Sequence, residues 1–238
     1  MNTRVGASLH FDAVQAAKGV LKKETNRDRQ RRERIEHIIG VAVEVFAREG
    51  MANFSMRRIA SLAGITLSTL QHYFGSQKSL LVTTINSIGI HYMGLLDSLS
   101  KDVSITARER FDNIVDKIII WSLDPLLSAA YFELFALSCR DETISGLMDE
   151  VYATFYGVLI NVVAEINPEL TDEQAKIIGI LIGTQADGLA IFARHGVSTK
   201  LPATEMGSAM KAGWLKLVIP PEPASAGPKS VRGTGRKG

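Results

Sequence analysis

The chain has 238 residues, of which 46% are hydrophobic and 22% charged, so it is long enough for one small and one medium domain with a real core. Its formal net charge of +2 is unevenly distributed: residues 1–80 carry 13 basic and 7 acidic side chains, residues 81–219 carry 10 and 17, and residues 220–238 carry 4 and 1. A basic N-terminal part attached to an acidic body is typical of a protein that binds a polyanion with one end only.

The sequence argues against a membrane or secreted protein. The most apolar run, Ile177 to Gly183, is far shorter than the roughly 20 residues that a membrane-spanning helix needs, and residues 1–20 lack a signal-peptide pattern. We therefore expect a soluble cytoplasmic protein that does not enter a membrane. The single cysteine, Cys139, has no cysteine partner, and we expect it to be buried as a small hydrophobic residue.

Residues 1–32 are predicted to form a flexible arm, because they lack sustained helical periodicity outside 11–21 and end in a dense run of charges. Such an arm could add phosphate or minor-groove contacts to a nucleic acid. It could instead be a solvated terminal segment, or a start assigned upstream of the true domain, and these interpretations stay open. From Arg34 to Arg48 the apolar residues recur on one helical face, and Gly50 ends this first predicted helix.

The stretch from Ser55 to Leu80 has the spacing of two short helices joined by a tight turn, a helix-turn-helix. Gly64 marks the turn, since glycine adopts a positive φ at no steric cost, and Thr66 is the predicted N-cap of a second helix that runs to about Phe74. Six residues fall where such a motif buries side chains: Ile59, Ala60, Ala63, Ile65, Leu70 and Phe74.

The outward side chains of the second helix are mostly short and polar, which suits a helix whose N-terminal end enters the major groove of DNA. Gln71 has the strongest case for a base contact, because glutamine can bond bidentately to adenine, and the alternative is a solvated amide. Ser55 is the predicted N-cap of the first short helix and could donate its hydroxyl to a phosphate. Arg57 and Arg58 follow it, facing either the DNA backbone or solvent.

The run from Arg34 to Leu81 resembles the N-terminal domain of the tetracycline-repressor (TetR) family of bacterial transcription regulators, with AREG at a helix end, IASLAGIT at the turn and TLQHYF in the second helix. Two positions depart from the family pattern: Gln71 stands where a phosphate-binding tyrosine is usual, and Gln77 where a lysine usually opens the fourth helix. Lys78 could take over that phosphate contact, although one residue is about 100° around a helix.

The residues and the resemblance together predict ten DNA-binding positions: Ser55, Arg57, Thr66, Leu67, Ser68, Thr69, Gln71, His72, Tyr73 and Lys78.

The rest of the chain is predicted to be helical, and start signals with a physical basis place the helices. A long fourth helix should begin after Ser76 and reach about Leu99, and further helices are expected near 106–122, 125–139, 142–166, 171–195 and 203–218. The predicted fold is all-α. It comprises a three-helix DNA-binding domain at 33–80, a larger effector-binding and dimerisation domain at 81–219, and a disordered tail at 220–238.

Two late segments carry more apolar surface than one core needs. Residues 175–192 are apolar on more than one face, and the last helix presents Met206, Met210, Trp214, Leu217 and Val218. Paired, these helices predict a four-helix homodimer interface, as in the resembled family.

Aromatic side chains with polar tips recur in the body, where they could be plain core or could line a ligand pocket. Asp187 is the clearest candidate, because an aspartate in an otherwise apolar helix pairs with a cation or polar partner, caps across an interface, or binds a ligand. The predicted ligand-binding residues are His91, Trp121, Tyr131, Phe135, Tyr152, Tyr156, Gln185 and Asp187.

These observations predict a homodimeric, sequence-specific transcription regulator, a repressor that a small-molecule effector of unknown identity releases from a palindromic DNA operator. The alternative is a DNA-binding regulator without such an effector, either an activator or a protein controlled by a partner. An enzyme is disfavoured, because the sequence has no glycine-rich phosphate loop, no nucleophile elbow and no paired histidine spacing for a metal, and no cofactor is expected.

Overall fold

The computed structural model describes residues 25–195 and 200–219, and these residues fold into α-helices and one short 3-10 turn, without a β-strand. The first helices are α2 (Asn26–Glu49), α3 (Met56–Leu62) and α4 (Leu67–Phe74), with the 3-10 turn η2 (Met51–Asn53) after α2. The others are α5 (Gln77–Ser100), α6 (Ala107–Leu123), α7 (Pro125–Ser138), α8 (Glu142–Ile166), α9 (Asp172–His195) and α10 (Ala203–Val218). The predicted all-α class is confirmed.

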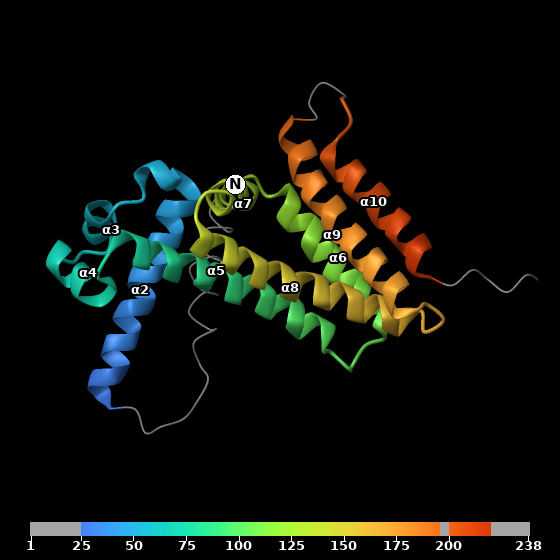
Figure 1. The fold of residues 1–238 in the computed structure, drawn as a ribbon, viewed down its shortest axis with the longest axis horizontal. Coiled ribbons are helices and arrows are strands. Elements are labelled where there is room, and N and C mark those ends of the chain that lie inside the picture. Colours follow the sequence, from blue (N-terminus) through green and yellow to red (C-terminus); the bar gives the residue numbers. More distant parts are fainter. Residues whose placement is uncertain (1–24, 196–199, 220–238) are drawn as a thin grey trace, which may run out of the picture.

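The helices form two groups, one at each end of the molecule, joined by long helices (Figure 1). Helices α3 and α4 lie at one end of the molecule beside α2, whereas α6, α9 and α10 gather at the other end. The long helices α5 and α8 run side by side between the two ends, so α5 continues directly from the N-terminal unit into the body.

Helix starts agree closely with the sequence. Side chains accept hydrogen bonds from backbone N–H groups in the first turn at five of the six predicted starts after residue 75: Ser76, Thr106, Asp124, Asp141 and Thr171. Each of these oxygens satisfies a donor that the helix itself cannot pair, which is why such residues mark helix starts in sequence. The sixth helix, α10, follows Pro202 and has no side-chain cap.

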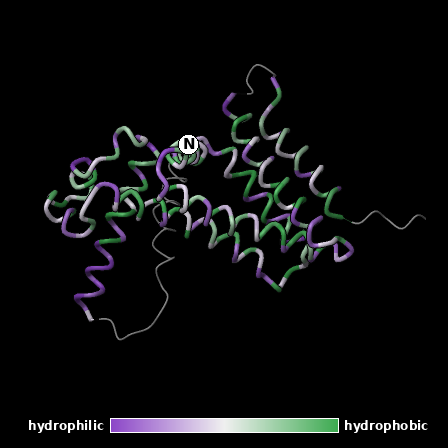
Figure 2. Tube along the Cα trace, in the orientation of Figure 1, coloured by the Kyte–Doolittle hydropathy of each residue, from purple (hydrophilic) through white to green (hydrophobic). Residues whose placement is uncertain are grey.

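Helix α2 begins at Asn26 rather than near Arg34, so the predicted arm at 1–32 is wrong for residues 26–32. A capping box starts the helix: the Thr25 hydroxyl accepts from the Asp28 N–H at 3.2 Å, and the Asp28 carboxylate accepts from the Thr25 N–H. These first turns are hydrophilic (Figure 2) and lack the apolar periodicity on which the prediction relied. Ion pairs one turn apart, such as Arg32 with Glu36 at 3.2 Å, support them instead.

Three further expectations concern single segments. The rest of the predicted arm, residues 1–24, and the predicted tail at 220–238 lie outside the described residues. The prediction for Cys139 was wrong, because its side chain is exposed at the C-terminal end of α7, where the chain turns toward α8.

The buried side chains form two clusters. One contains the core of the helix-turn-helix and continues into the body through Ala130 and Leu134 of α7 and Ile144 and Met148 of α8. The other lies among α5, α6, α8, α9 and α10 and includes Trp214. The first cluster spans the predicted domain boundary near residue 80, so the N-terminal unit and the body pack against each other.

By length and composition alone, α5, α8 and α9 could each cross a membrane, a property that the search for one uninterrupted apolar run did not detect. In the structure each of them contributes buried side chains to the two clusters, and α8 packs along both α5 and α9. Burial inside the molecule accounts for 28% of the apolar stretch in α5 and in α8 and for 39% of that in α9.

Candidate nucleic-acid interface and ligand cavity

The helix-turn-helix has the geometry that the sequence predicts. Gly64 lies at the turn with a φ of 66°, a conformation that favours glycine, and the backbone N–H of Ile65 donates to the Ala60 carbonyl at 3.0 Å. Five of the six predicted core residues are buried and Ile65 packs against them half-buried. The turn and the shared core thus hold α4 against α3.

Helix α4 presents its capped N-terminal end and one polar side to solvent. The Thr66 hydroxyl accepts from the Thr69 N–H at 3.1 Å and also hydrogen-bonds the Thr69 hydroxyl at 2.8 Å. Four of the predicted contact residues on and before α4 are exposed and three are half-buried: Thr66, Ser68, Gln71 and His72 in the first group, and Leu67, Thr69 and Tyr73 in the second. The exposed amide of Gln71 and the hydroxyl of Ser68 are therefore available for base edges.

The start of α3 supplies a second set of polar groups. The Ser55 hydroxyl accepts from the Arg58 N–H at 3.3 Å and caps the helix as predicted. The Arg58 guanidinium donates to both carboxylate oxygens of Glu49, at 2.8 and 3.2 Å, so its charge is paired within the N-terminal unit. Arg57 is exposed, and of the two arginines it is the better placed to meet a phosphate.

Lys78 has a partner that the sequence did not reveal. Its Nζ lies 2.7 Å from an Asp141 carboxylate oxygen, in an ion pair that joins the first turn of α5 to the N-cap of α8. The hydrogen bond from Lys78 lowers the pKa of the Asp141 carboxyl below its ordinary value, and the backbone N–H groups that donate to this cap lower it further. In this conformation Lys78 binds the body, and a phosphate would have to compete with Asp141 for it.

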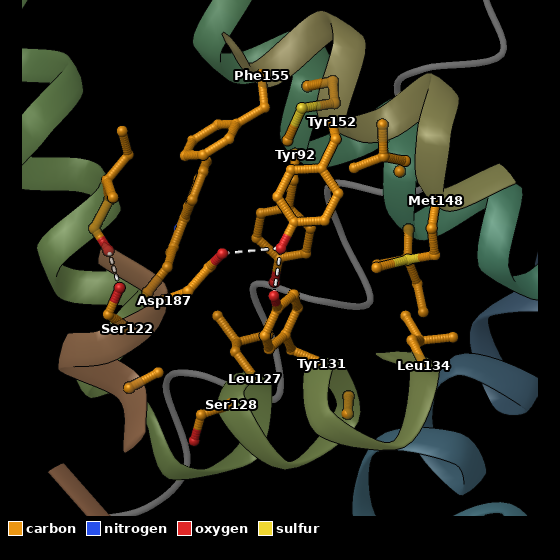
Figure 3. A pocket seen from close by; sticks show the side chains of 18 of the residues that line it. Tyr92, Ser122, Leu127, Ser128, Tyr131, Leu134, Met148, Tyr152, Phe155 and Asp187 are labelled. Atoms are coloured by element: carbon orange, nitrogen blue, oxygen red, sulfur yellow. Dashed lines mark hydrogen bonds between the residues drawn. The ribbon is translucent and has the colours of Figure 1, made fainter. Parts of the chain in front are cut away.

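A cavity of about 210 Å³ lies where the N-terminal unit meets the body, and Figure 3 shows side chains that line it. Its wall comes from α2 and from α5 to α9, and most of it is aliphatic or aromatic. The polar exceptions are few: Tyr92, Trp121, Ser122, Ser128, Tyr131, Tyr152 and Asp187.

Three of these polar groups form a chain of hydrogen bonds across the cavity (Figure 3). The Tyr152 hydroxyl donates to the Asp187 carboxylate at 2.8 Å, and the Tyr131 hydroxyl hydrogen-bonds the Tyr152 hydroxyl. Since the single Tyr152 proton is given to Asp187, Tyr131 is the donor in the second bond. The chain links α7, α8 and α9 around one carboxylate.

Burial shifts the ionisation of all three groups. Loss of hydration raises the pKa of Asp187, and the tyrosine hydroxyls that bond to it oppose this shift only in part. Burial likewise raises the pKa of Tyr131 to about 12 and that of Tyr152 still further. Both phenols are therefore neutral donors at physiological pH.

Four of the eight predicted ligand-binding residues line this cavity: Trp121, Tyr131, Tyr152 and Asp187. The other four do not. Phe135 is one turn beyond Tyr131 and 53% exposed, and His91 precedes Tyr92 on a different side of α5. Gln185 accepts a hydrogen bond from the indole N–H of Trp214 at 2.6 Å.

Tyr156, the fourth, packs over Gly183 of α9. A Cβ atom added at Gly183 would lie 2.6 Å from the Tyr156 ring, so the glycine lets α8 and α9 approach closely there. The ring contributes to helix packing, and its centroid lies 5.3 Å from that of the Tyr152 ring.

Sequence reasoning missed the part of the wall that comes from the N-terminal unit. Val43 and Ala47 of α2 line the cavity. They carried no recognisable signal, because small aliphatic residues on the buried face of an amphipathic helix look the same whether they meet a core or a cavity. Their presence means that a ligand in the cavity would touch the first helix of the DNA-binding unit.

Comparison with known proteins agrees with this architecture. Residues 38–83 match the family described as bacterial regulatory proteins, tetR family. The chain is 25% identical over 165 residues to an uncharacterised HTH-type transcriptional regulator of Xanthobacter autotrophicus, covering 66% of this chain and 78% of that protein. It is 30% identical over 110 residues to the HTH-type transcriptional regulator LuxR of Vibrio harveyi, covering 46% of this chain and 53% of that one.

Solved structures share the fold over most of the chain. A TetR transcription regulator from Haloarcula marismortui superposes with a TM-score of 0.64 at 17% identity, covering 78% of this chain and 96% of that one. A regulator from Saccharomonospora viridis, solved in complex with choline, superposes with a TM-score of 0.63 at 20% identity, covering 79% and 97%.

Proposed function

Because the chain belongs to the TetR family of transcription regulators and carries a DNA-binding helix-turn-helix, we propose that it is a homodimeric repressor that a small-molecule effector releases from a palindromic operator. The observation that carries this proposal is the position of the cavity, which is lined both by α2 of the DNA-binding unit and by α7, α8 and α9 of the body. A molecule bound there contacts both parts at once.

Base reading is assigned to the exposed side of α4. Ser68 and Gln71 contact base edges, and Ser55, Arg57 and Thr66 contact the flanking phosphates. Leu67 and Thr69 are half-buried, so only part of each side chain contacts the major groove. His72 and Tyr73 lie toward the C-terminal end of the helix. Lys78 joins the phosphate contacts when it leaves Asp141.

Dimerisation is assigned to the outer faces of α9 and α10. Three exposed residues share one face of α9: Ile177, Leu181 and Ile191. Leu217 is exposed on α10. Trp214 and Val218, which the sequence pattern placed in the same interface, are buried within the protomer instead. A two-fold interface would place two recognition helices about one turn of DNA apart, roughly 34–36 Å.

Release follows if the effector prefers a conformer in which the two recognition helices no longer match the operator. The choline complex of the Saccharomonospora viridis regulator supports a small molecule as the effector. The cavity is a binding site rather than an active site, because two phenols of raised pKa and one carboxylate supply hydrogen bonds but no activated nucleophile. The regulator works in the cytoplasm, where its operator is.

Selection of bound duplexes from a random library tests this function. The wild type should enrich a palindromic consensus, and Gln71→Ala should lose information at one position in each half-site, worth about 1–3 kcal/mol of discrimination. Asn161→Ala removes an exposed amide from α8 in the body and should keep the consensus. Binding without any consensus, with only a steep salt dependence, would indicate a nonspecific DNA-binding protein.

A further inference from the structure

The Asp187 carboxylate is exposed to the cavity but has no cation beside it in the described part of the chain. Its direct hydrogen-bond donor is Tyr152, which in turn accepts from Tyr131. Within the described part of the chain, the cavity wall contains no lysine, arginine or histidine. The nearest basic residue along α9, Arg194, is two helical turns away and donates to the Ser128 hydroxyl and the Pro125 carbonyl.

A carboxylate in this setting is poorly stabilised when it is ionised. Two hydroxyl dipoles replace only part of the hydration that the charge loses, and burial of an unpaired charge is costly. The carboxyl group is therefore stabilised either by taking up a proton or by binding a ligand that carries a positive charge. A ligand that brings a cation would exchange its own hydration for a pre-arranged counter-ion.

The aromatic wall has the chemistry that favours the same kind of ligand. The rings of Tyr92 and Trp121 meet edge to face with centroids 4.8 Å apart, and Tyr152 and Phe155 stand beside each other on α8. Aromatic faces attract weakly hydrated organic cations, most strongly when water is excluded. Most of the remaining wall is aliphatic and offers no partner to further polar groups of a ligand.

The size of the cavity limits the ligand. An apolar cavity of about 150 Å³ holds benzene, so 210 Å³ has room for one ring or short branched chain with an ammonium head. A longer molecule would have to extend beyond this volume.

From these features we infer that the effector is a small organic cation, a tertiary or quaternary ammonium with an apolar substituent, whose charge lies against Asp187 and the surrounding aromatic rings. This inference rests on the proposed function only in treating the cavity as the effector site. The Tyr131–Tyr152 chain orients the carboxylate, and Trp121 and Tyr92 cover the apolar part.

A matched pair of probes separates charge from shape. Phenyltrimethylammonium and tert-butylbenzene have the same heavy-atom arrangement, but only the first is charged. Titration calorimetry on the full-length protein should show that phenyltrimethylammonium binds the wild type. Asp187→Asn should weaken its binding roughly tenfold or more, because the substitution removes the buried counter-ion, while the affinity for tert-butylbenzene stays the same or rises.

Two controls complete the experiment. Asp149→Asn removes an exposed carboxylate from α8, next to Met148 of the cavity wall, and should change neither affinity. Retained binding of tert-butylbenzene by Asp187→Asn shows that its cavity is intact, so a folding defect cannot imitate the expected loss. The inference is overturned if phenyltrimethylammonium does not bind the wild type, or if Asp187→Asn changes the two affinities equally.

Failure of this inference differs from failure of the proposed function. If tert-butylbenzene alone binds and also releases the operator, the ligand class is wrong and the effector site stands. If phenyltrimethylammonium binds in an Asp187-dependent way but leaves operator affinity unchanged, the ligand class is upheld and the proposed release is wrong.

Discussion

Glu133 of α7 accepts a hydrogen bond from the backbone N–H of Met51 at 2.6 Å and so ties the body to the segment that joins α2 to α3. Gly50 beside it fits the carboxylate closely: a Cβ there would lie 2.5 Å from Glu133 Oε1, and its φ of 73° also favours glycine. Two residues before Glu133, Tyr131 extends into the cavity. One short helix thus contacts both the ligand site and the base of the DNA-binding unit.

Removal of this contact should weaken the junction. Glu133→Ala leaves the Met51 N–H without its charged acceptor, so the free energy of unfolding measured in urea should fall by about 1–2 kcal/mol. Glu133→Gln keeps an acceptor oxygen and should lose less. Glu150→Ala, at an exposed position of α8, should have no measurable effect. Equal losses for Glu133→Ala and Glu150→Ala would show that the contact contributes nothing to the junction.

The Lys78–Asp141 pair should compete with DNA. Asp141→Asn keeps a good helix cap but frees Lys78, so DNA affinity should rise and log K should fall more steeply with log salt, by about 0.9 for one additional phosphate contact. In the double variant Lys78→Ala/Asp141→Asn, the rise in DNA affinity and the steeper salt dependence should both disappear. Because pairing lowers the pKa of Asp141, the ion pair persists above the ordinary carboxyl pKa and is lost as pH falls through the lowered value. An unchanged salt slope in Asp141→Asn would leave Lys78 without a role on DNA.

Asp187 should reduce stability at neutral pH. Its folded pKa is raised above the ordinary 3.8, so the native state binds more protons than the unfolded state between the two values, and stability falls as pH rises through that window. The titratable groups described around it are the phenols of Tyr92, Tyr131, Tyr152 and Tyr156, and phenols ionise far above this range.

Asp187→Asn should therefore be more stable than the wild type by about 1 kcal/mol at pH 7, and the difference should shrink toward pH 4. Urea denaturation at both pH values measures it. A difference that is the same at both pH values would mean that ionisation of Asp187 carries no cost in the folded protein.

Charge on the outer face of α9 should break the proposed dimer. Ile177→Glu places a carboxylate in that face, and sedimentation should then show monomers at concentrations where the wild type is dimeric. Ile90 of α5 provides a matched control, since it is 59% exposed and Ile177 is 57% exposed. Dissociation by Ile90→Glu but not by Ile177→Glu would place the interface elsewhere.

The sequence was most informative where one residue determines local geometry. Gly64, Thr66 and the caps at Thr106, Asp124 and Asp141 were identified correctly because each satisfies backbone groups or φ values within a few residues. The start of α2 was missed because its first turns are held by a capping box and ion pairs and bury no apolar stripe.

The cavity was only partly predictable, because its wall depends on how helices rotate against one another. Asp187 was recognisable as a charge in an apolar helix. Gln185 lies only two residues away but about 200° around α9, on the side that faces Trp214. Likewise Tyr131 lines the cavity, whereas Phe135, one turn later on α7, lies outside it and is exposed. The spacing of residues shows which side chains share a helix face, but it does not show which face lines the cavity.

Reciprocal linkage between the cavity and DNA tests the account most directly. The affinity for a selected operator duplex should be measured by fluorescence anisotropy, without ligand and with phenyltrimethylammonium at a concentration that saturates the cavity. The ligand should weaken DNA binding by roughly 5–150-fold in the wild type and should have little effect in Asp187→Asn. Equal DNA affinity in the wild type with the cavity empty and saturated would contradict the claim that this cavity controls the DNA-binding unit.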